Sequence, residues 1–291
     1  MSLLQAILLG IIQGLTEFLP VSSSGHLVIF QNIFHINTDG GMLFDIMLHL
    51  GTLVAVITVY RRDIKKMLIE TIKIGIDIVK NIKTWIYNRK FDEALRYKRI
   101  IHNNYRKFVV LILVSTIPTA IIGYTAKSLV EAAGKTLIVP GVCLLITGVL
   151  LLVSEISEEG HKIPKDVSYS SGFFIGIAQG LATLPGLSRS GTTIAACLLG
   201  GFDRRFAVKY SFIMSIPAIL GAAVLELKDV GKEAVSGSLV FNCVIGAAVA
   251  AVAGYICIKL MLKIVKNKKL KGFAFYCFAI GTVAIIAHFV I

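Results

Sequence analysis

The sequence predicts an all-α polytopic membrane protein made of two inverted-topology repeats, each a re-entrant helical hairpin plus three transmembrane helices. Its 291 residues are 56% hydrophobic, with a mean hydropathy of +0.80. Charged residues account for only 16%, against about 25% in soluble domains. Apolar runs of membrane-spanning length recur along the chain, and two segments 166 positions apart are alike. We therefore expect six full spans and two re-entrant hairpins.

The two predicted hairpins cover residues 3–35 and 171–201. Each is an apolar stretch broken by a polar, proline-containing turn, at 20–25 in the first and 185–191 in the second. The piece that follows the first break, 23–34, has 12 residues. It would form roughly 18 Å of helix. A hydrocarbon core is about 30 Å thick, so each stretch is expected to enter the membrane and return.

The six predicted spans cover about 42–60, 107–125, 137–154, 206–227, 238–263 and 272–291. The first hairpin and the first three spans make repeat one, 1–154, and the second hairpin and last three spans make repeat two, 171–291. Residues 10–26 (GIIQGLTEFLPVSSSGH) align without a gap on 176–192 (GIAQGLATLPGLSRSGT), with eight identities in 17. A hairpin returns the chain to its starting side and three spans reverse it, so the second repeat should be inverted.

The distribution of basic residues indicates the orientation. With both termini outside, the cytoplasmic segments hold 25 of the 30 Lys and Arg, and the external loops hold four. This asymmetry agrees with the positive-inside rule. Inverted repeats with broken helices place a binding site near the middle of the bilayer, where the two hairpin tips meet.

A basic insert, 61–106, interrupts repeat one. Between 61 and 107 there are 14 Lys and Arg against 5 Asp and Glu, which explains much of the net charge of +13. Because these charges flank spans, they favour the anionic membrane surface over nucleic acid as a partner. Apolar residues at helical spacing predict an amphipathic helix on the inner leaflet: Ile64, Leu68, Ile72, Val79, Ile82 and Ile86. The five cysteines form no CxxC pair and are interpreted as small buried hydrophobes.

The hairpin tips carry the groups expected to bind an anion. Ser22, Ser24 and Gly25 lie at the start of one half-helix, and Ser188 and Ser190 at the start of the other. Serine hydroxyls cap helix N-termini, whose free N–H groups attract phosphate oxygens. Arg189, at the second tip, could bond two phosphoryl oxygens at once with its planar guanidinium. These groups predict a diphosphate site; the alternative is that Arg189 pairs with a carboxylate to hold the hairpins together.

Catalysis is assigned to Glu17, Ser23 and His26. Ser23 and His26 are three residues apart at a helix start and share a face, so the imidazole could activate the hydroxyl for attack on phosphorus. Glu17 could orient His26, accept a proton, or bind a divalent cation, Mg²⁺ or Ca²⁺, together with Gln13. The nucleophile stays open among Ser23, His26 and water.

Asp45 and His49 lie four residues apart on one face of the first full span, beside the first hairpin. We expect them to support the site residues from a second layer.

The motifs QGLTEFLPVSSSGHL and LPGLSRSGTT resemble the two signature motifs of the bacterial undecaprenyl pyrophosphate phosphatases, the bacitracin-resistance proteins. The resemblance covers essentially the whole chain. It implies functional roles for Glu17, Ser23, His26 and Arg189, with Ser188 and Thr193 beside the arginine. Gln13 stands where the family has either glutamate or glutamine, which leaves one carboxylate fewer for a two-carboxylate metal site.

The resemblance also implies the reaction: removal of the terminal phosphate from the C55 isoprenyl diphosphate carrier at the outer face of the cytoplasmic membrane. Peptidoglycan precursor recycling and bacitracin resistance would follow. The partners are then the lipid substrate and the bilayer, with no nucleic acid, and a homodimer is left open. The second hypothesis is a polyprenyl-phosphate transporter or flippase, because inverted repeats with broken helices are a transporter architecture.

Overall fold

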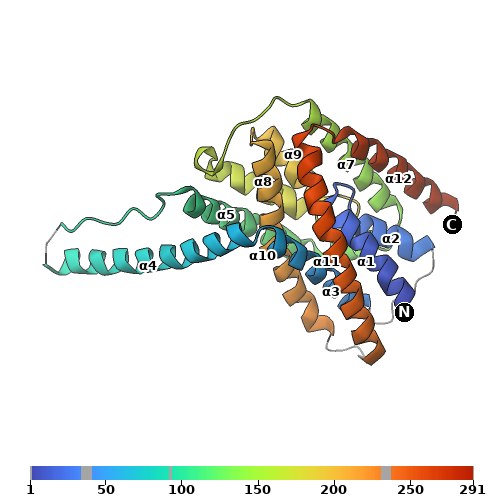
Figure 1. The fold of residues 1–291 in the computed structure, drawn as a ribbon, viewed down its shortest axis with the longest axis horizontal. Helices are drawn as coiled ribbons and strands as arrows, with labels where there is room; N and C mark the ends of the chain where they lie inside the picture. The colour runs from blue at the N-terminus through green and yellow to red at the C-terminus, as the bar shows by residue number, and fades with distance from the viewer. Residues whose placement is uncertain (1, 34–40, 92–93, 231–236, 291) are drawn as a thin grey trace.

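The computed structural model describes residues 2–33, 41–91, 94–230 and 237–290, and most of these residues lie in helices (Figure 1). They form twelve α-helices and one short 3₁₀ helix. The helices are α1 (Leu3–Phe18), α2 (Ser23–Ile33), α3 (Gly41–Val59), α4 (Arg61–Phe91), α5 (Asn104–Thr125), α6 (Lys127–Ala133), α7 (Ile138–Ile156), η1 (Pro164–Asp166), α8 (Tyr169–Leu181), α9 (Arg189–Leu199), α10 (Arg204–Val230), α11 (Gly237–Lys266) and α12 (Lys271–Val290).

Six of these helices, α3, α5, α7, α10, α11 and α12, are long and apolar enough to cross a membrane. They coincide with the six predicted spans, so the all-α, multi-pass architecture is confirmed. Helices α5, α10 and α11 extend beyond the predicted limits because their ends carry polar and basic residues that continue the helix past the apolar run. Polar ends of this kind suit the headgroup region, where such side chains are solvated.

Each predicted hairpin is a pair of short helices, α1–α2 and α8–α9. Helix α1 ends at Phe18, since Leu19 is extended and precedes a proline. The second pair is interrupted around Gly186, whose φ of +90° is a conformation that favours glycine. Helices α2 and α9 have 11 residues each, too few to cross a bilayer. Helix α8 begins two residues before the predicted hairpin, and residues 34–35 of the first hairpin lie outside the described residues.

Each hairpin packs on a helix of the other half of the chain. Helix α1 lies against α11, and α8 lies against α5, while α7 packs on α12. The two contacts are close: a Cβ added at Gly10 would lie 2.7 Å from the carbonyl oxygen of Gly246, and one at Gly176 would overlap that of Ser115. Small residues permit such approach between membrane helices. Gly10 and Gly176 also occupy equivalent positions in the aligned segments.

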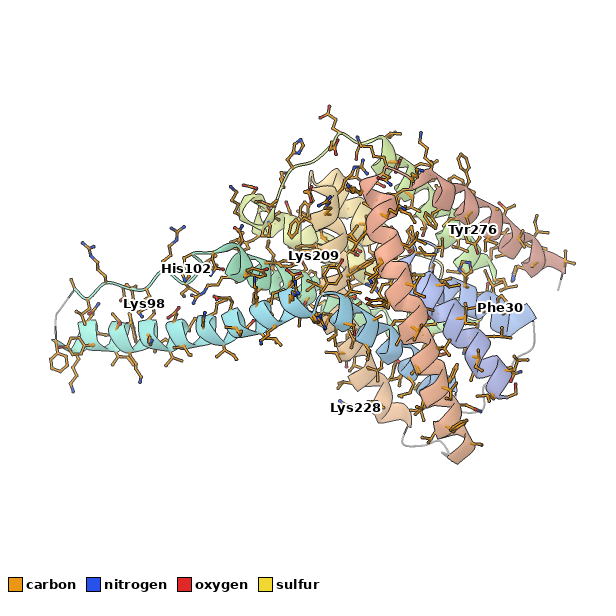
Figure 2. All side chains as sticks on the ribbon, viewed as in Figure 1. Phe30, Lys98, His102, Lys209, Lys228 and Tyr276 are labelled. Atoms are coloured by element: carbon orange, nitrogen blue, oxygen red, sulfur yellow. The ribbon has the colours of Figure 1, made fainter. Side chains whose placement is uncertain are left out.

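The predicted amphipathic helix forms as α4, a 31-residue helix that projects away from the other helices in Figure 1. Only Tyr60 separates it from the end of α3. Residues 94–103 return alongside it, and Figure 2 labels Lys98 and His102 on this segment. We call α4 together with residues 94–107 the arm. In Figure 1 both termini lie on the side of the molecule opposite the arm.

Candidate active site

The two hairpin tips touch each other. Ser190 Oγ donates a hydrogen bond to the carbonyl oxygen of Leu19, 3.2 Å away. A Cβ added at Gly25 would lie 2.9 Å from the Cα of Gly186, so the two backbones meet with no room for a side chain between them. This contact brings together residues from positions far apart in the sequence.

Glu17 lies at the centre of the contact and is buried. Its Oε1 accepts a hydrogen bond from Nη2 of Arg189 at 2.7 Å. Its Oε2 accepts one from Oγ of Ser23 at 2.6 Å and another from Nε2 of Gln13 at 2.9 Å. The carboxylate therefore joins both hairpins, and the predicted alternative, an Arg189–carboxylate pair between them, is part of what the structure shows.

His49 reaches the same network from α3. Its Nδ1 lies 3.0 Å from Nε2 of Gln13 and 3.7 Å from Oε2 of Glu17. These contacts place His49 beside Gln13 and Glu17, and its second-layer role stays a prediction. Asp45, one turn earlier, interacts electrostatically with His49, and its Oδ1 has no hydrogen-bond partner among the described residues.

The two helix starts are built alike. Oγ of Ser22 accepts a hydrogen bond from N–H of Gly25, and Oγ of Ser188 accepts one from N–H of Gly191. The predicted capping by serine is thus confirmed at both tips. Ser24 and Ser190 each place Oγ near the capping hydroxyl, at 3.4 and 3.3 Å.

Ser23 and Arg189 are the first residues of α2 and α9, and the 166-residue offset makes them equivalent positions. One hairpin therefore supplies a hydroxyl where the other supplies a guanidinium. Nη1 of Arg189 is buried and has no hydrogen-bond partner among the described residues. A buried charged donor is costly to leave unbonded, so this atom is suited to an anionic ligand.

The expected pairing of Ser23 with His26 is wrong in this structure, where Ser23 bonds Glu17 instead. Nδ1 of His26 lies 2.8 Å from the carbonyl oxygen of Ser22, and its Nε2 lies 2.8 Å from the hydroxyl of Tyr276. Residues three apart share a helix face, but the backbone carbonyl at the helix start and α12 attract the imidazole away from the hydroxyl. Because a carbonyl only accepts, Nδ1 carries the proton and neutral His26 presents Nε2 as an acceptor.

Tyr276 is the site residue that the sequence did not reveal. It lies on α12, labelled in Figure 2, and its ring stacks on that of His26 with centroids 5.6 Å apart. It is 250 residues from His26, inside an ordinary apolar span. No motif or spacing marks it, and only the packing of α12 beside α2 brings it to the site.

Thr193 is engaged within its own helix. Its Oγ1 donates to the carbonyl oxygen of Arg189 at 2.8 Å and also contacts Oγ of Ser211 on α10. The hydroxyl therefore positions α9 against α10. It could reach a substrate only by giving up one of these bonds.

A divalent cation would find few ligands in the described residues, where no three His, Cys, Asp or Glu side chains gather. The available oxygens are those of Glu17 and Oε1 of Gln13, a buried atom with no hydrogen-bond partner in the part of the chain that the structure describes. Both are hard ligands of the kind that Mg²⁺ and Ca²⁺ take. The five cysteines are free and buried, as predicted.

Comparison with known proteins identifies the family. The sequence model described as "Bacitracin resistance protein BacA" matches residues 6–283, which include both hairpins except the first residues of α1, and all six spans except the last turns of α12. The chain belongs to the BacA family. It is similar to proteins named undecaprenyl-diphosphatase from Methanosphaera stadtmanae (38% identical over the whole of both chains), Desulforapulum autotrophicum (40%, also over the whole of both) and Desulfosudis oleivorans (41%, 97% of each chain). These three matches cover 97–100% of this chain and 97–100% of each relative.

Proposed function

We propose that the protein is an integral-membrane phosphohydrolase that converts undecaprenyl diphosphate to undecaprenyl phosphate and inorganic phosphate. The main support for this activity is one hydrogen-bond network, at the contact of the two hairpin tips, that joins Ser23, Glu17 and Arg189. A hydroxyl, a carboxylate and a guanidinium are the groups needed to attack, deprotonate and hold a phosphoryl group. The names of the relatives support the same substrate.

The diphosphate is bound by Arg189 and the starts of α2 and α9. The free Nη1 of Arg189 donates to a phosphoryl oxygen, and the positive ends of the two helix dipoles add to the attraction. Ser22, Ser24 and Gly25 line one helix start, and Ser188, Ser190 and Thr193 belong to the other. The prenyl tail stays in the bilayer while its head group enters between the helices.

In the first step, Oγ of Ser23 attacks the terminal phosphorus. The O–H bond of Ser23 breaks and its proton passes to Glu17, whose Oε2 is 2.6 Å from Oγ. A phosphorus–oxygen bond forms to Oγ, and the bond from the terminal phosphorus to the bridging oxygen breaks. The electron pair of that bond stays on the bridging oxygen, and undecaprenyl phosphate leaves.

In the second step, water attacks the same phosphorus and the bond to Oγ of Ser23 breaks. Glu17 returns its proton to Oγ, and both hydrogens of the water leave on the inorganic phosphate, as dihydrogen phosphate. Arg189 stabilises negative charge on the phosphoryl oxygens in both steps. The enzyme is restored and the sum of the steps is hydrolysis.

His26 is the second proposed proton carrier, and it bonds Ser22 and Tyr276 rather than Ser23. With Nδ1 held by the carbonyl oxygen of Ser22, its Nε2 is the atom that can accept or return a proton. The hydroxyl of Tyr276 is bonded to that atom and fixes the ring. Attack by His26 itself would form a phosphohistidine instead of a phosphoserine, which the experiment below separates.

We also propose that Mg²⁺ or Ca²⁺ assists, held by Glu17, by Oε1 of Gln13 and by phosphate oxygens of the substrate. When bound, the cation would neutralise charge on the diphosphate. The unpartnered Oε1 of Gln13 supports this site, and the small number of protein ligands makes the substrate the main source of oxygens.

We further propose that the site opens to the outer face of the cytoplasmic membrane and that both termini lie outside. The distribution of Lys and Arg supports the orientation, and the corresponding contacts of α1 with α11 and of α8 with α5 support two inverted repeats with re-entrant hairpins. In this position the enzyme would return the lipid carrier for peptidoglycan synthesis and, by consuming the diphosphate lipid, confer bacitracin resistance.

The test is phosphate release from undecaprenyl diphosphate by purified protein in detergent, with and without EDTA. Wild type should release phosphate, Ser23→Ala and Arg189→Ala should release almost none, and Lys135→Ala, which removes an exposed charge outside the site, should match wild type. Loss of activity in EDTA that Mg²⁺ or Ca²⁺ restores would support the cation.

Trapping with labelled substrate identifies the nucleophile. Phosphoserine at Ser23 agrees with the proposed step, phosphohistidine at His26 replaces it, and no phosphoenzyme indicates direct attack by water. No phosphate release from folded wild type, even with added cation, would overturn the phosphatase in favour of a polyprenyl-phosphate transporter.

A further inference from the structure

One face of α4 is covered by the returning segment of the arm. Oδ1 of Asn81 accepts from N–H of Lys98 and its Nδ2 donates to the carbonyl oxygen of the same residue, at 2.8 and 2.9 Å. Asn88 bonds Leu95 in the same two ways, at 3.1 and 2.9 Å. The two asparagines therefore fix the returning chain to a single face of the helix.

Arg106 closes the arm at the same face. It is buried, with Nε 2.7 Å from Oε2 of Glu70 and Nη1 2.7 Å from Oδ2 of Asp77. Its Nη1 also donates to the carbonyl oxygen of Ile100. The bonds to Glu70 and Asp77 turn this face of α4 toward Arg106 and the returning segment, so the opposite face of α4 faces away from them.

The outward face is apolar. A stripe of five residues at intervals of three, four or seven has side chains that are 52–65% exposed: Leu68, Ile72, Val79, Ile82 and Ile86. We call these five residues the α4 stripe. Exposed apolar residues on the candidate spans have similar values, such as Ile121 and Val224, both 59% exposed. A contiguous apolar surface of this kind indicates a partner.

The lysines beside the α4 stripe favour an anionic partner. The carboxylates of α4 are already used inside the chain, since Asp63 pairs with Lys209, while Glu70 and Asp77 pair with Arg106. Among the described residues, Lys65, Lys80 and Lys83 form no ion pair within 4 Å, and Lys80 interacts with Asp77 only at longer range. Val79 and Ile86 lie four residues before and three after Lys83, so its ammonium flanks the stripe. A second copy would bring like charges together, which disfavours self-association.

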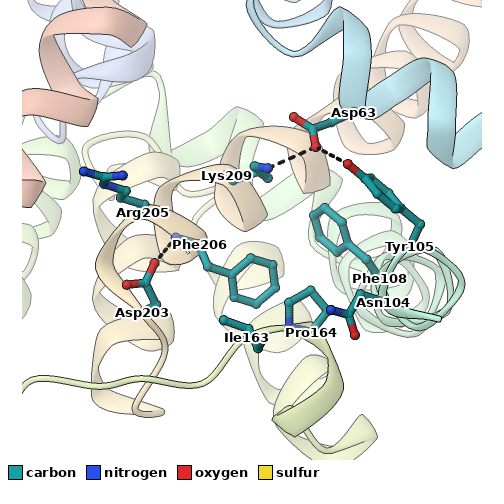
Figure 3. Close-up of a pocket in the computed structure, with 10 residues that line it drawn as sticks. All are labelled: Asp63, Asn104, Tyr105, Phe108, Ile163, Pro164, Asp203, Arg205, Phe206 and Lys209. Carbon is teal, nitrogen blue, oxygen red and sulfur yellow. Dashed lines mark hydrogen bonds and ion pairs between the residues drawn. The ribbon is translucent and has the colours of Figure 1, made fainter.

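The arm is attached to the bundle at the end of a membrane span. Oδ1 of Asp63 accepts hydrogen bonds from Nζ of Lys209 on α10, at 3.0 Å, and from the hydroxyl of Tyr105 on α5, at 3.1 Å. Figure 3 shows these two bonds at the pocket where α4, α5 and α10 meet. Because α3 ends at Val59 and α4 begins at Arg61, the arm starts where a span leaves the hydrocarbon.

We propose that the arm is a lipid-binding element that inserts the α4 stripe into the headgroup region of an anionic leaflet, with its lysines against the lipid phosphates. An amphipathic helix binds a membrane surface through apolar burial plus attraction to anionic lipid, and each basic residue near the surface contributes about 1 kcal/mol. The proposal rests on the arm alone and is independent of the phosphatase reaction.

Insertion of the arm can be followed by the fluorescence of Trp85. It is the one tryptophan of the chain and lies on α4, where its side chain is 52% exposed. Full-length protein is placed in lipid nanodiscs, one copy per disc, of phosphatidylcholine alone or mixed with phosphatidylglycerol. With phosphatidylglycerol, Trp85 emission should shift to shorter wavelength and be quenched by lipids brominated on their acyl chains. In phosphatidylcholine alone, both effects should be weaker.

Two variants test the two parts of the mechanism. Val79→Glu should abolish the shift and the quenching in both lipids, while Val79→Leu, its apolar control, should retain them. Lys80→Gln with Lys83→Gln should weaken the preference for phosphatidylglycerol by about fivefold for each lysine removed. Circular dichroism equal to wild type shows that α4 is still folded in each variant.

Trp85 that stays open to aqueous iodide in both lipids would overturn the proposal in favour of a protein partner. Burial of Trp85 that appears only in discs holding two copies would overturn it in favour of self-association.

Discussion

Glu17 and Arg189 are 172 residues apart, yet Oε1 of the first lies 2.7 Å from Nη2 of the second. The pair joins the two hairpins. The other oxygen of Glu17, Oε2, accepts a hydrogen bond from the hydroxyl of Ser23. One carboxylate thus serves both to hold the tips together and to contact the proposed nucleophile. Structural and catalytic roles of this pair are therefore coupled, and experiments must separate them.

The substitution Arg189→Lys separates the structural role of the arginine from its catalytic role. Lysine keeps a positive charge for Glu17 but lacks the planar fork and the second nitrogen that is free for phosphate. We expect thermal stability near that of wild type and a loss of about 10²–10³ in kcat for phosphate release. Phosphate-release kinetics with a parallel thermal melt provide the measurement.

Arg189→Ala should behave differently, because it leaves the buried Glu17 carboxylate without a counter-charge at a cost of about 3–5 kcal/mol. Adding Glu17→Gln to it should recover much of the stability without recovering activity. If Arg189→Lys keeps full activity, the arginine serves only to hold the hairpins together.

Tyr276 is expected to position His26. Tyr276→Phe removes the hydroxyl that bonds Nε2 but keeps the stacked ring. A neutral hydrogen bond contributes about 0.5–1.5 kcal/mol, so kcat should fall by up to about tenfold with KM unchanged. Tyr276→Leu, which removes the ring as well, should reduce kcat further, and wild-type kinetics in Tyr276→Phe would contradict a role for the hydroxyl.

Much of this architecture follows from the sequence because membranes enforce it. A span must be a long apolar helix with its backbone bonds satisfied, so the six spans could be predicted within a few residues. The hairpins are equally visible, since Pro20 and Gly186 interrupt runs that then restart with serine caps. The motifs identified Glu17, Ser23 and Arg189 as site residues before any geometry was available.

The sequence predicted less accurately which side chains bond to one another. Helical periodicity placed Ser23 and His26 on one face, but a helix start offers a free carbonyl and a neighbouring helix offers a phenol, and His26 takes both. Asp45 shares a face with His49, yet its Oδ1 has no hydrogen-bond partner among the described residues. Such choices depend on tertiary packing, which a single sequence does not encode in any local pattern.

The arm should loosen in acid. Hydrogen bonds from Arg106, then from Lys73, hold the pKa of Glu70 at about 2, below its ordinary 4.5. Asp77 is shifted in the same direction by Arg106. Because the pKa is lowered in the folded state, the stabilisation is complete above about pH 4.5 and is lost as the pH falls toward 2.

Hydrogen exchange at N–H of Leu95 and of Lys98 measures this loosening, since both are bonded to asparagines of α4. Their protection factors should be constant at neutral pH and decrease in acid. Glu70→Gln with Asp77→Asn should lower protection at neutral pH and remove the decrease. A wild-type profile flat to about pH 2 would show that the Arg106 pairs do not hold the arm.

Gly186 should be intolerant of any side chain. It sits at the tip contact with φ of +90°, and a Cβ there would overlap the carbonyl oxygen of Pro140 on α7. Gly186→Ala therefore meets both backbone strain, of order 1–3 kcal/mol, and a steric clash. We expect a lower Tm and loss of activity, because displacement of this tip moves Arg189 away from Glu17.

Gly221→Ala is the matched control. Gly221 lies inside α10, and a Cβ there would meet nothing within 4 Å. Alanine is favoured over glycine in a helix interior by about 0.5–1 kcal/mol, so this variant should melt at or above the wild-type temperature and keep full activity. Thermal melts and phosphate release on both variants test the idea, and equal behaviour of the two would show that the tip backbone tolerates rearrangement.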